Sequence, residues 1–242
     1  MSSNPLVSVV MPTYNRADMI EKAINSVMNQ TYENIQLVIV DDHSTDHTDE
    51  FVKNKFNEFL NCTAGDKRSI KYLYSTSKGI PSVRNQAVEA SDGEYIAFLD
   101  SDDEWNLEKI SKQMEYMKSN PDCEIVFSGY ENVSKDGKTV TDQAQLKLFT
   151  EEYQMYMASA CMKKILFDKI GLYDTGLITG EDYEWVCRAK ISGINVNHNI
   201  DEVLYYRTIH ENNISLTSDS FNPENKKTVW MKAIRNAAKR RK

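Results

Sequence analysis

The sequence predicts an α/β domain organised around a mostly parallel β-sheet. Two observations support this prediction. Short apolar runs rich in β-branched residues alternate with segments whose apolar residues recur at helical spacing, and these runs are nearly continuous, as in strands covered on both faces. Four such strand–helix units follow one another in the first 120 residues, which favours a parallel sheet flanked by helices.

The individual elements follow from apolar spacing and from helix-start and breaker residues. The first strand, residues 6–11, ends at Pro12, and Asp18 stands where its side chain would cap the helix of residues 19–28. Pro81 favours a helix over residues 81–90, because proline is preferred in the first turn. The other predicted elements are strands at 35–40, 70–74 and 95–99 and helices at 48–59 and 107–117.

The pattern changes after a further predicted strand at residues 123–128. Residues 133–140 are typical of a β-hairpin that turns at Asp136 and Gly137, and the following hundred residues mix short strands with helices. We expect this half to be an α+β elaboration of the same sheet. The predicted organisation is one domain over residues 1–225, divided near residue 120, and a basic tail or helix over residues 226–242.

Charge is distributed unevenly along the 242 residues. The chain holds 29 Lys and Arg against 36 Asp and Glu, yet its last 17 residues hold eight basic residues and no acidic one. Residues 1–225 therefore carry a net charge of −15. This excludes nucleic-acid binding over a broad face, which needs clustered cations. The eight basic residues are Lys226, Lys227, Lys232, Arg235, Lys239, Arg240, Arg241 and Lys242.

The basic tail also has apolar residues at helical spacing. A helix of this kind can lie on an anionic membrane, with its tryptophan at the interface. The same pattern fits a solvated terminus or a helix that packs on a partner subunit. The apolar residues are Val229, Trp230, Ala233, Ile234 and Ala237.

Composition and cysteine spacing indicate an ordinary intracellular globular protein. Hydrophobic residues make up 40% of the chain, which excludes disordered and fibrous classes. The four cysteines are far apart and form no C-x-x-C pair, so we expect reduced packing residues. No signal peptide and no apolar window of about 18 residues is present. We expect a cytoplasmic protein, held at the inner face of the membrane if the tail binds lipid.

Polar loops follow the predicted strands at the edge where parallel strands bind ligands. These loops are residues 12–16, 41–46 and 100–104, and their carboxylates repel one another unless a cation lies between them. Asp100 and Asp102 supply the hard oxygen ligands that Mg²⁺ or Mn²⁺ prefers. The alternative is an acidic cap for the helix that begins near residue 107. No glycine-rich phosphate loop of the dinucleotide or P-loop type occurs.

Five segments, taken in order, resemble glycosyltransferase family 2, whose members transfer sugars from nucleotide sugars and have the GT-A fold. They are 7–16 (VSVVMPTYNR), 39–46 (IVDDHSTD), 79–85 (GIPSVRN), 95–105 (YIAFLDSDDEW) and 180–185 (GEDYEW). The resemblance covers residues 6–210. It implies that residues 1–120 bind the nucleotide sugar and residues 121–225 form the acceptor side.

The resemblance also implies roles for individual residues. The segment Pro12, Thr13 and Tyr14, together with Asp41, matches the elements that hold the nucleotide base, usually uracil. Arg16, Arg84 and Ser101 match residues that bind the donor, and Asp100 matches the residue that reaches the ribose or sugar. Asp102 and His210 match residues that bind the metal, Mn²⁺ or Mg²⁺. Glu181 and Asp182 match the catalytic residues, with Asp182 as the base.

The residues alone leave other interpretations open. Arg84 could pair with Glu89 or with another surface carboxylate, and Glu181 with Asp182 could be an ordinary acidic first turn. His210 could be a solvated or hydrogen-bonded histidine without a ligand role. Trp105 and Trp185 are more typical of packing than of sugar binding.

We therefore expect an inverting, metal-dependent glycosyltransferase. It would move a sugar from a UDP-sugar to a glycan or lipid-linked acceptor in cell-surface polysaccharide synthesis. The alternatives are a nucleotidyltransferase, which usually has a basic glycine-rich loop that residues 12–16 lack, and a non-catalytic protein that binds nucleotide sugars or glycans. The sequence gives no prediction of the oligomeric state.

Overall fold

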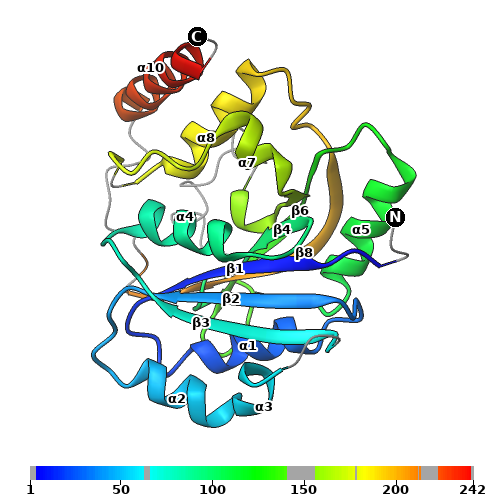
Figure 1. The fold of residues 1–242 in the computed structure, drawn as a ribbon, viewed down its shortest axis with the longest axis vertical. Helices are drawn as coiled ribbons and strands as arrows, with labels where there is room; N and C mark the ends of the chain where they lie inside the picture. Colours follow the sequence, from blue (N-terminus) through cyan, green and yellow to red (C-terminus); the bar gives the residue numbers. More distant parts are fainter. Residues whose placement is uncertain are drawn as a thin grey trace.

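The protein contains a mixed eight-stranded sheet flanked by helices (Figure 1). The computed structural model describes residues 4–62, 66–140, 156–177, 179–211, 213 and 223–240. The strand order is β3-β2-β1-β4-β7-β6-β8-β5. The strands are β1 (Val7–Thr13), β2 (Ile35–Asp41), β3 (Arg68–Tyr74), β4 (Tyr95–Phe98), β5 (Glu104–Trp105), β6 (Ile125–Ser134), β7 (Cys161–Lys163) and β8 (Asn199–Ile209).

The predicted parallel half and the mixed second half are both present. Strands β1 to β4 pair in parallel, so their carboxyl ends meet at one edge of the sheet. β7 runs antiparallel to both of its neighbours. β6 and β8 pair in parallel, and the short β5 adds antiparallel to β8. The later strands therefore extend the first half on its β4 side, which confirms the predicted elaboration.

Helices cover both faces of the sheet, as the continuous apolar strands predicted. In Figure 1, α1, α2 and α3 lie on one face and α4, α7 and α8 on the other. Alternate side chains of β1 enter two separate cores: Val9 and Met11 join one, and Val10 joins the other. The helices are α1 (Ile20–Met28), α2 (Thr48–Lys55), α3 (Asn57–Leu60), α4 (Ile80–Ala90), α5 (Lys109–Ser119), α7 (Ile165–Ile170), α8 (Glu181–Ile191) and α10 (Pro223–Arg240).

Two local predictions were wrong. Asp18 does not cap α1, which begins at Ile20 without a side-chain cap. Asp18 instead lies 3.5 Å from the ammonium group of Lys135. The predicted helix at 48–59 is two helices, because the backbone leaves helical geometry at Phe56, whose φ is −116°. Phe56 is buried in the core beneath β2 and β3, and this packing outweighs continuation of the helix.

The predicted turn at Asp136 and Gly137 is confirmed. Ser134 and Lys138 are joined by a backbone hydrogen bond of 2.8 Å, and Gly137 adopts a φ of +80° that suits glycine. This turn follows directly on β6. The segment 141–155 that comes next lies outside the described residues.

The basic tail contains a long helix, α10, that packs on α8 of the same chain. Three of the five apolar residues predicted to form one stripe, Val229, Ala233 and Ala237, are buried there, whereas Trp230 and Ile234 are exposed. The predicted stripe is thus divided between two environments. Helix α10 begins at Pro223, three residues before the predicted start of the tail, and the functional division of the chain stays a prediction.

No described helix is long and apolar enough to span a membrane. Cys123, Cys161 and Cys187 are buried and all four cysteines are free thiols, as their spacing predicted. Trp105 and Trp185 are buried core residues, which confirms the packing interpretation for both.

Candidate active site

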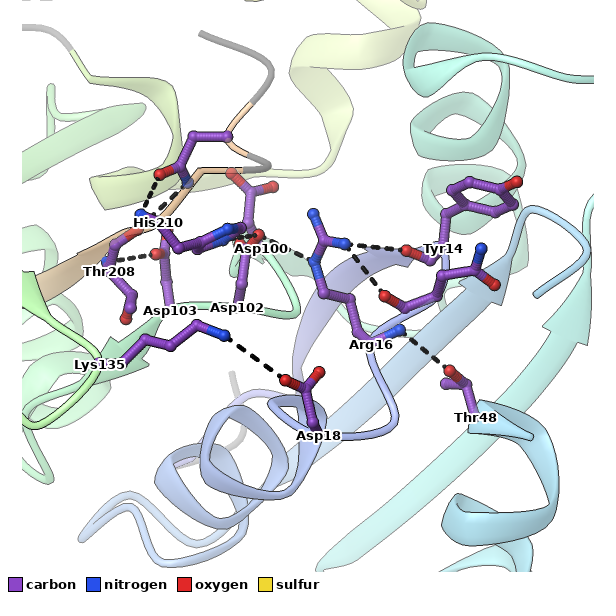
Figure 2. A network of polar contacts seen from close by, with 12 residues as sticks. Tyr14, Arg16, Asp18, Thr48, Asp100, Asp102, Asp103, Lys135, Thr208 and His210 are labelled. Atoms are coloured by element: carbon purple, nitrogen blue, oxygen red, sulfur yellow. Dashed lines mark hydrogen bonds and ion pairs between the residues drawn. The ribbon is translucent and has the colours of Figure 1, made fainter. Parts of the chain in front are cut away.

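The acidic loops gather at the carboxyl ends of β1, β2 and β4, together with the end of β8. The residues that follow each strand are polar and stay outside the apolar cores. Because the parallel strands end at the same edge of the sheet, these polar side chains lie close together there. Figure 2 shows Arg16, Asp102 and His210 pointing toward one another from three different segments, with Asp100 close by.

Asp102 lies at the centre of this group. Its Oδ2 accepts a hydrogen bond from Nε of Arg16 at 3.0 Å and lies 3.0 Å from Nε2 of His210 (Figure 2). Burial alone would raise the pKa of Asp102, but the hydrogen bond from His210 and the charge of Arg16 hold that pKa below its usual value. The carboxylate of Asp102 is therefore ionised at physiological pH.

Arg84 links the two halves of the domain. From α4 its guanidinium donates to Oε1 of Glu181 at 2.6 Å and to Oδ1 of Asp100 at 3.0 Å. The alternative pairing with Glu89 is wrong, because both contacts run to other elements. The Nε of Arg84 is buried and has no hydrogen-bond partner among the described residues. A buried donor of this kind can bind a water molecule or a ligand atom.

Glu181 and Asp182 occupy different environments at the start of α8. Glu181 is buried, and desolvation raises its pKa to about 7 although the charge of Arg84 opposes the shift. Asp182 is only half-buried, and its Oδ1 accepts a hydrogen bond from the backbone N–H of Tyr183 at 2.7 Å. Asp182 is thus the more accessible carboxylate, whereas Glu181 is hydrogen-bonded to Arg84.

Asp103 is a part of this arrangement that sequence reasoning did not single out. It is fully buried, and it accepts hydrogen bonds from the hydroxyl of Tyr205 at 2.6 Å and from the backbone N–H of Thr208 at 2.7 Å. Burial, reinforced by the charges of Asp102 and Asp100, raises its pKa well above the usual range. The two bonds hold the 100–104 loop against β8, two residues before His210.

The loop 100–104 is not a helix cap. β5 separates it from α5, which begins at Lys109 without any side-chain cap. Ser101 is buried in the loop, next to Asp100 and Asp102. The carboxylates of this loop bond to arginine, histidine and tyrosine side chains instead of to the first turn of the helix.

The residues predicted to hold the nucleotide base lie at the ends of β1 and β2. Pro12 and Thr13 complete β1, and Tyr14 beyond them is exposed. The hydroxyl of Thr13 is buried without a hydrogen-bond partner among the described residues. Asp41 is fully buried, with Oδ1 bound by Ser44 and Oδ2 bound by the hydroxyl of Tyr72.

Asp41 therefore fixes the loop that follows β2, and its contact with a base stays a prediction. The neighbouring Asp42 accepts hydrogen bonds from Ser75 and from the N–H of Gly79, which joins this loop to the start of α4. Tyr14 is free to contact a flat ring with its exposed face.

The donor set suits one divalent cation. Oδ2 of Asp102 and Nε2 of His210 come from different elements and lie 3.0 Å apart, and carboxylate oxygens suit Mg²⁺ and Mn²⁺. Within the described part of the chain, no three His, Cys, Asp or Glu side chains form a metal-binding cluster. If Asp102 and His210 held a cation, diphosphate oxygens would complete its shell, as is usual for Mg²⁺.

Comparison with known proteins identifies the family. The family model described as "Glycosyl transferase family 2" matches residues 8–172. WfaP of Escherichia coli, named as a UDP-Glc:alpha-D-GlcNAc-diphosphoundecaprenol beta-1,3-glucosyltransferase, is 34% identical over 215 residues, which cover 87% of this chain and 80% of WfaP. TuaG of Bacillus subtilis, named for teichuronic acid biosynthesis, is 39% identical over 135 residues, 55% of this chain and 50% of TuaG.

Solved structures show the same fold. TarS of S. aureus, in a complex with UDP-GlcNAc, superposes with a TM-score of 0.73 at 23% identity over 96% of this chain and 66% of the TarS chain. The mannosyltransferase PcManGT of Pyrobaculum calidifontis, in complex with GDP-Man and Mn²⁺, gives a TM-score of 0.72 at 19% identity over 97% of this chain and 65% of PcManGT. The chain spans about half to two thirds of the length of TuaG, TarS and PcManGT.

The fold is therefore that of a GT-A domain, with its acidic edge at the carboxyl ends of the parallel strands. The chain belongs to glycosyl transferase family 2.

Proposed function

We propose that this domain transfers a sugar from a UDP-sugar to an acceptor hydroxyl with inversion at the anomeric carbon. The observation that carries the proposal is the junction of the two halves at Arg84. This residue joins Asp100 of the acidic loop to Glu181, the neighbour of Asp182. Asp100, Arg84 and Glu181 form one network of ion pairs, directly beside the proposed base in the sequence.

Asp182 is the proposed base. It is half-buried at the first turn of α8, where an acceptor hydroxyl can approach it. Asp182 would take the proton of the acceptor hydroxyl while that oxygen attacks the anomeric carbon, and the bond from this carbon to the diphosphate breaks on the opposite face. Because the displacement is direct, no protein nucleophile is needed.

Arg84 and Glu181 are proposed to position these groups. Arg84 holds Asp100 and Glu181 through its two terminal nitrogens. Asp102 and His210 would hold Mn²⁺ or Mg²⁺, which supplies positive charge that stabilises the departing diphosphate. Arg16 adds a second cation beside Asp102. Thr13, Tyr14 and Asp41 would contact the nucleotide base.

The names of the relatives favour a lipid-linked or polymeric acceptor at the cell surface. WfaP is named for a diphosphoundecaprenol acceptor, and TuaG for teichuronic acid synthesis. We extend the same acceptor class to this chain. A lipid-linked acceptor resides in a membrane, so the proposal includes peripheral contact of the domain with the cytoplasmic face of a membrane.

Replacing Asp182 by Asn tests the proposed base. We expect turnover of UDP-sugars, measured as UDP release with extracts of lipid-linked oligosaccharide, to fall by about 100-fold or more. UDP affinity should change little, since the hydrogen bond given for Asp182 runs to the backbone of Tyr183 in its own helix.

Asp168→Asn, at an exposed position of α7, is the matched control and should keep full turnover. Unchanged turnover in Asp182→Asn would show that Asp182 is not the base. A wild-type chain that binds UDP but releases none from any UDP-sugar would favour the non-catalytic alternative.

A further inference from the structure

The outer face of α10 is an exposed apolar strip. Trp230, Met231 and Ile234 are 39%, 47% and 44% exposed. Ile234 lies four residues after Trp230 and three after Met231, so it neighbours both on one side of the helix. Figure 1 shows α10 beyond α8, at the outside of the molecule.

The inner face of α10 holds this strip in a fixed orientation. Ala233 is fully buried against the domain, and the side-chain amide of Asn236 donates to Asp174 at 2.9 Å and to Glu184 of α8 at 3.0 Å. Lys232 pairs with Asp174 at 3.1 Å. The outer strip is therefore presented by a helix that is already formed and anchored, so a surface that covers it need not order it first.

The charge around the strip favours an anionic surface over a second copy of this chain. Residues 226–242 hold eight basic residues and no acidic one, and Arg235 beside Ile234 is exposed. Two such helices placed face to face would bring like charges together. Anionic lipid headgroups would pair with the cations while the apolar side chains enter the acyl boundary.

We propose that Trp230, Met231 and Ile234 form the docking surface of this domain for an anionic lipid bilayer. The inference deepens the proposed function and rests on it, since a lipid-linked acceptor would reach the site from that bilayer. The net charge of −15 on residues 1–225 repels an anionic surface, so docking through α10 also sets the orientation of the domain.

The position of α10 suits an acceptor carried in the bilayer. The side chain of Val229 lies 3.7 Å from the position that a Cβ would take on Gly180, the residue directly before Glu181 and Asp182. Helix α10 thus lies between a bilayer on its outer side and the helix that begins with the proposed base. With the domain docked, a lipid-linked acceptor reaches Asp182 by diffusing along the bilayer instead of through bulk solvent.

Tryptophan fluorescence gives a direct test with the full chain. Trp105 and Trp185 are buried in the core, so a change in emission on addition of vesicles reports on Trp230. We expect a blue shift with vesicles of phosphatidylcholine and phosphatidylglycerol, and none with phosphatidylcholine alone. The shift should disappear at high salt, where the attraction of the cations is screened.

Vesicle flotation of variants tests the strip itself. The double variant Trp230→Asp with Ile234→Asp should lower partition into anionic vesicles at least about tenfold. The controls are Leu107→Asp and Ile165→Asp, which alter residues outside α10 whose side chains are 50% and 48% exposed. Both controls should bind vesicles like the wild type. If the double variant does not fold, Arg235→Glu should lower partition several-fold instead.

Equal flotation of the double variant and the wild type would overturn the proposal. It would also be overturned by a blue shift of Trp230 that appears without vesicles as the protein concentration rises, since a second copy would then cover the strip. UDP titration of the same variants without vesicles should be unchanged. Loss of vesicle binding with intact UDP binding therefore separates failure of docking from failure of the proposed function.

Discussion

At the scale of single residues, Arg84 determines the electrostatics of the candidate site. It is buried and contacts two carboxylates from different segments, Asp100 and Glu181. An unpaired charge in such a place costs several kcal/mol, so each member of this group depends on the others. Such a network keeps the acidic loop and the start of α8 in a fixed relation before any substrate arrives.

The raised pKa of Glu181 predicts a pH dependence of folding. Burial raises this pKa from 4.5 to about 7, so between these values the folded chain binds a proton that the unfolded chain has lost. The stability from this group is present at low pH and is lost as pH rises from about 4.5 to about 7.

Urea unfolding across this pH window should show that the wild type loses stability relative to Glu181→Gln. The relative change is on the order of 3 kcal/mol over the window, since one pKa unit corresponds to about 1.4 kcal/mol. Comparison of the two chains removes the contributions of other titrating groups. Parallel stability curves would show that Glu181 titrates normally in the folded protein.

At the scale of elements, close backbone contact between the turn before β4 and the start of β1 fixes a central strand of the parallel half. A Cβ on Gly93 would lie 2.7 Å from the carbonyl oxygen of Leu6 and 2.7 Å from the N–H of Ser8. Both are backbone atoms, one directly before β1 and one within it, so they cannot move aside without shifting the strand. Glycine is needed here for space.

Gly93→Ala should therefore destabilise the domain by about 2 kcal/mol, the usual cost of overpacking. Denaturant unfolding measures this, and the midpoint should fall without a change in slope. Gly137→Ala is the comparison, because a Cβ there meets open space and costs only the strain of a positive φ. A Gly93 variant as stable as the wild type would mean that the turn before β4 adapts freely.

At the scale of the whole molecule, the order of elements could be predicted from sequence better than the contacts between them. Apolar runs and helical spacing gave the four strand–helix units, because local burial on both faces leaves a local pattern. The break at Phe56 and the pairing of Asp18 with Lys135 depend on distant packing, and they leave no such pattern.

The candidate site divides in the same way. Polar residues after buried strands indicated Asp100, Asp102 and the loop at 41–46, because strand ends share one edge of a sheet. The contact between Arg84 and Glu181 joins residues 97 positions apart, and Asp103 resembles its neighbours in sequence although it is fully buried. The positions of acidic residues in the sequence do not predict which of their carboxylates is buried.

The most direct test of this account is calorimetric titration of the wild type and Asp102→Ala with UDP, in Mn²⁺ and in chelator. We predict UDP binding by the wild type that needs Mn²⁺ and is at least about tenfold weaker in Asp102→Ala, while Asp136→Ala, at an exposed turn, behaves like the wild type. UDP binding that is independent of both Mn²⁺ and Asp102, or no binding by the wild type, would contradict the proposed donor site.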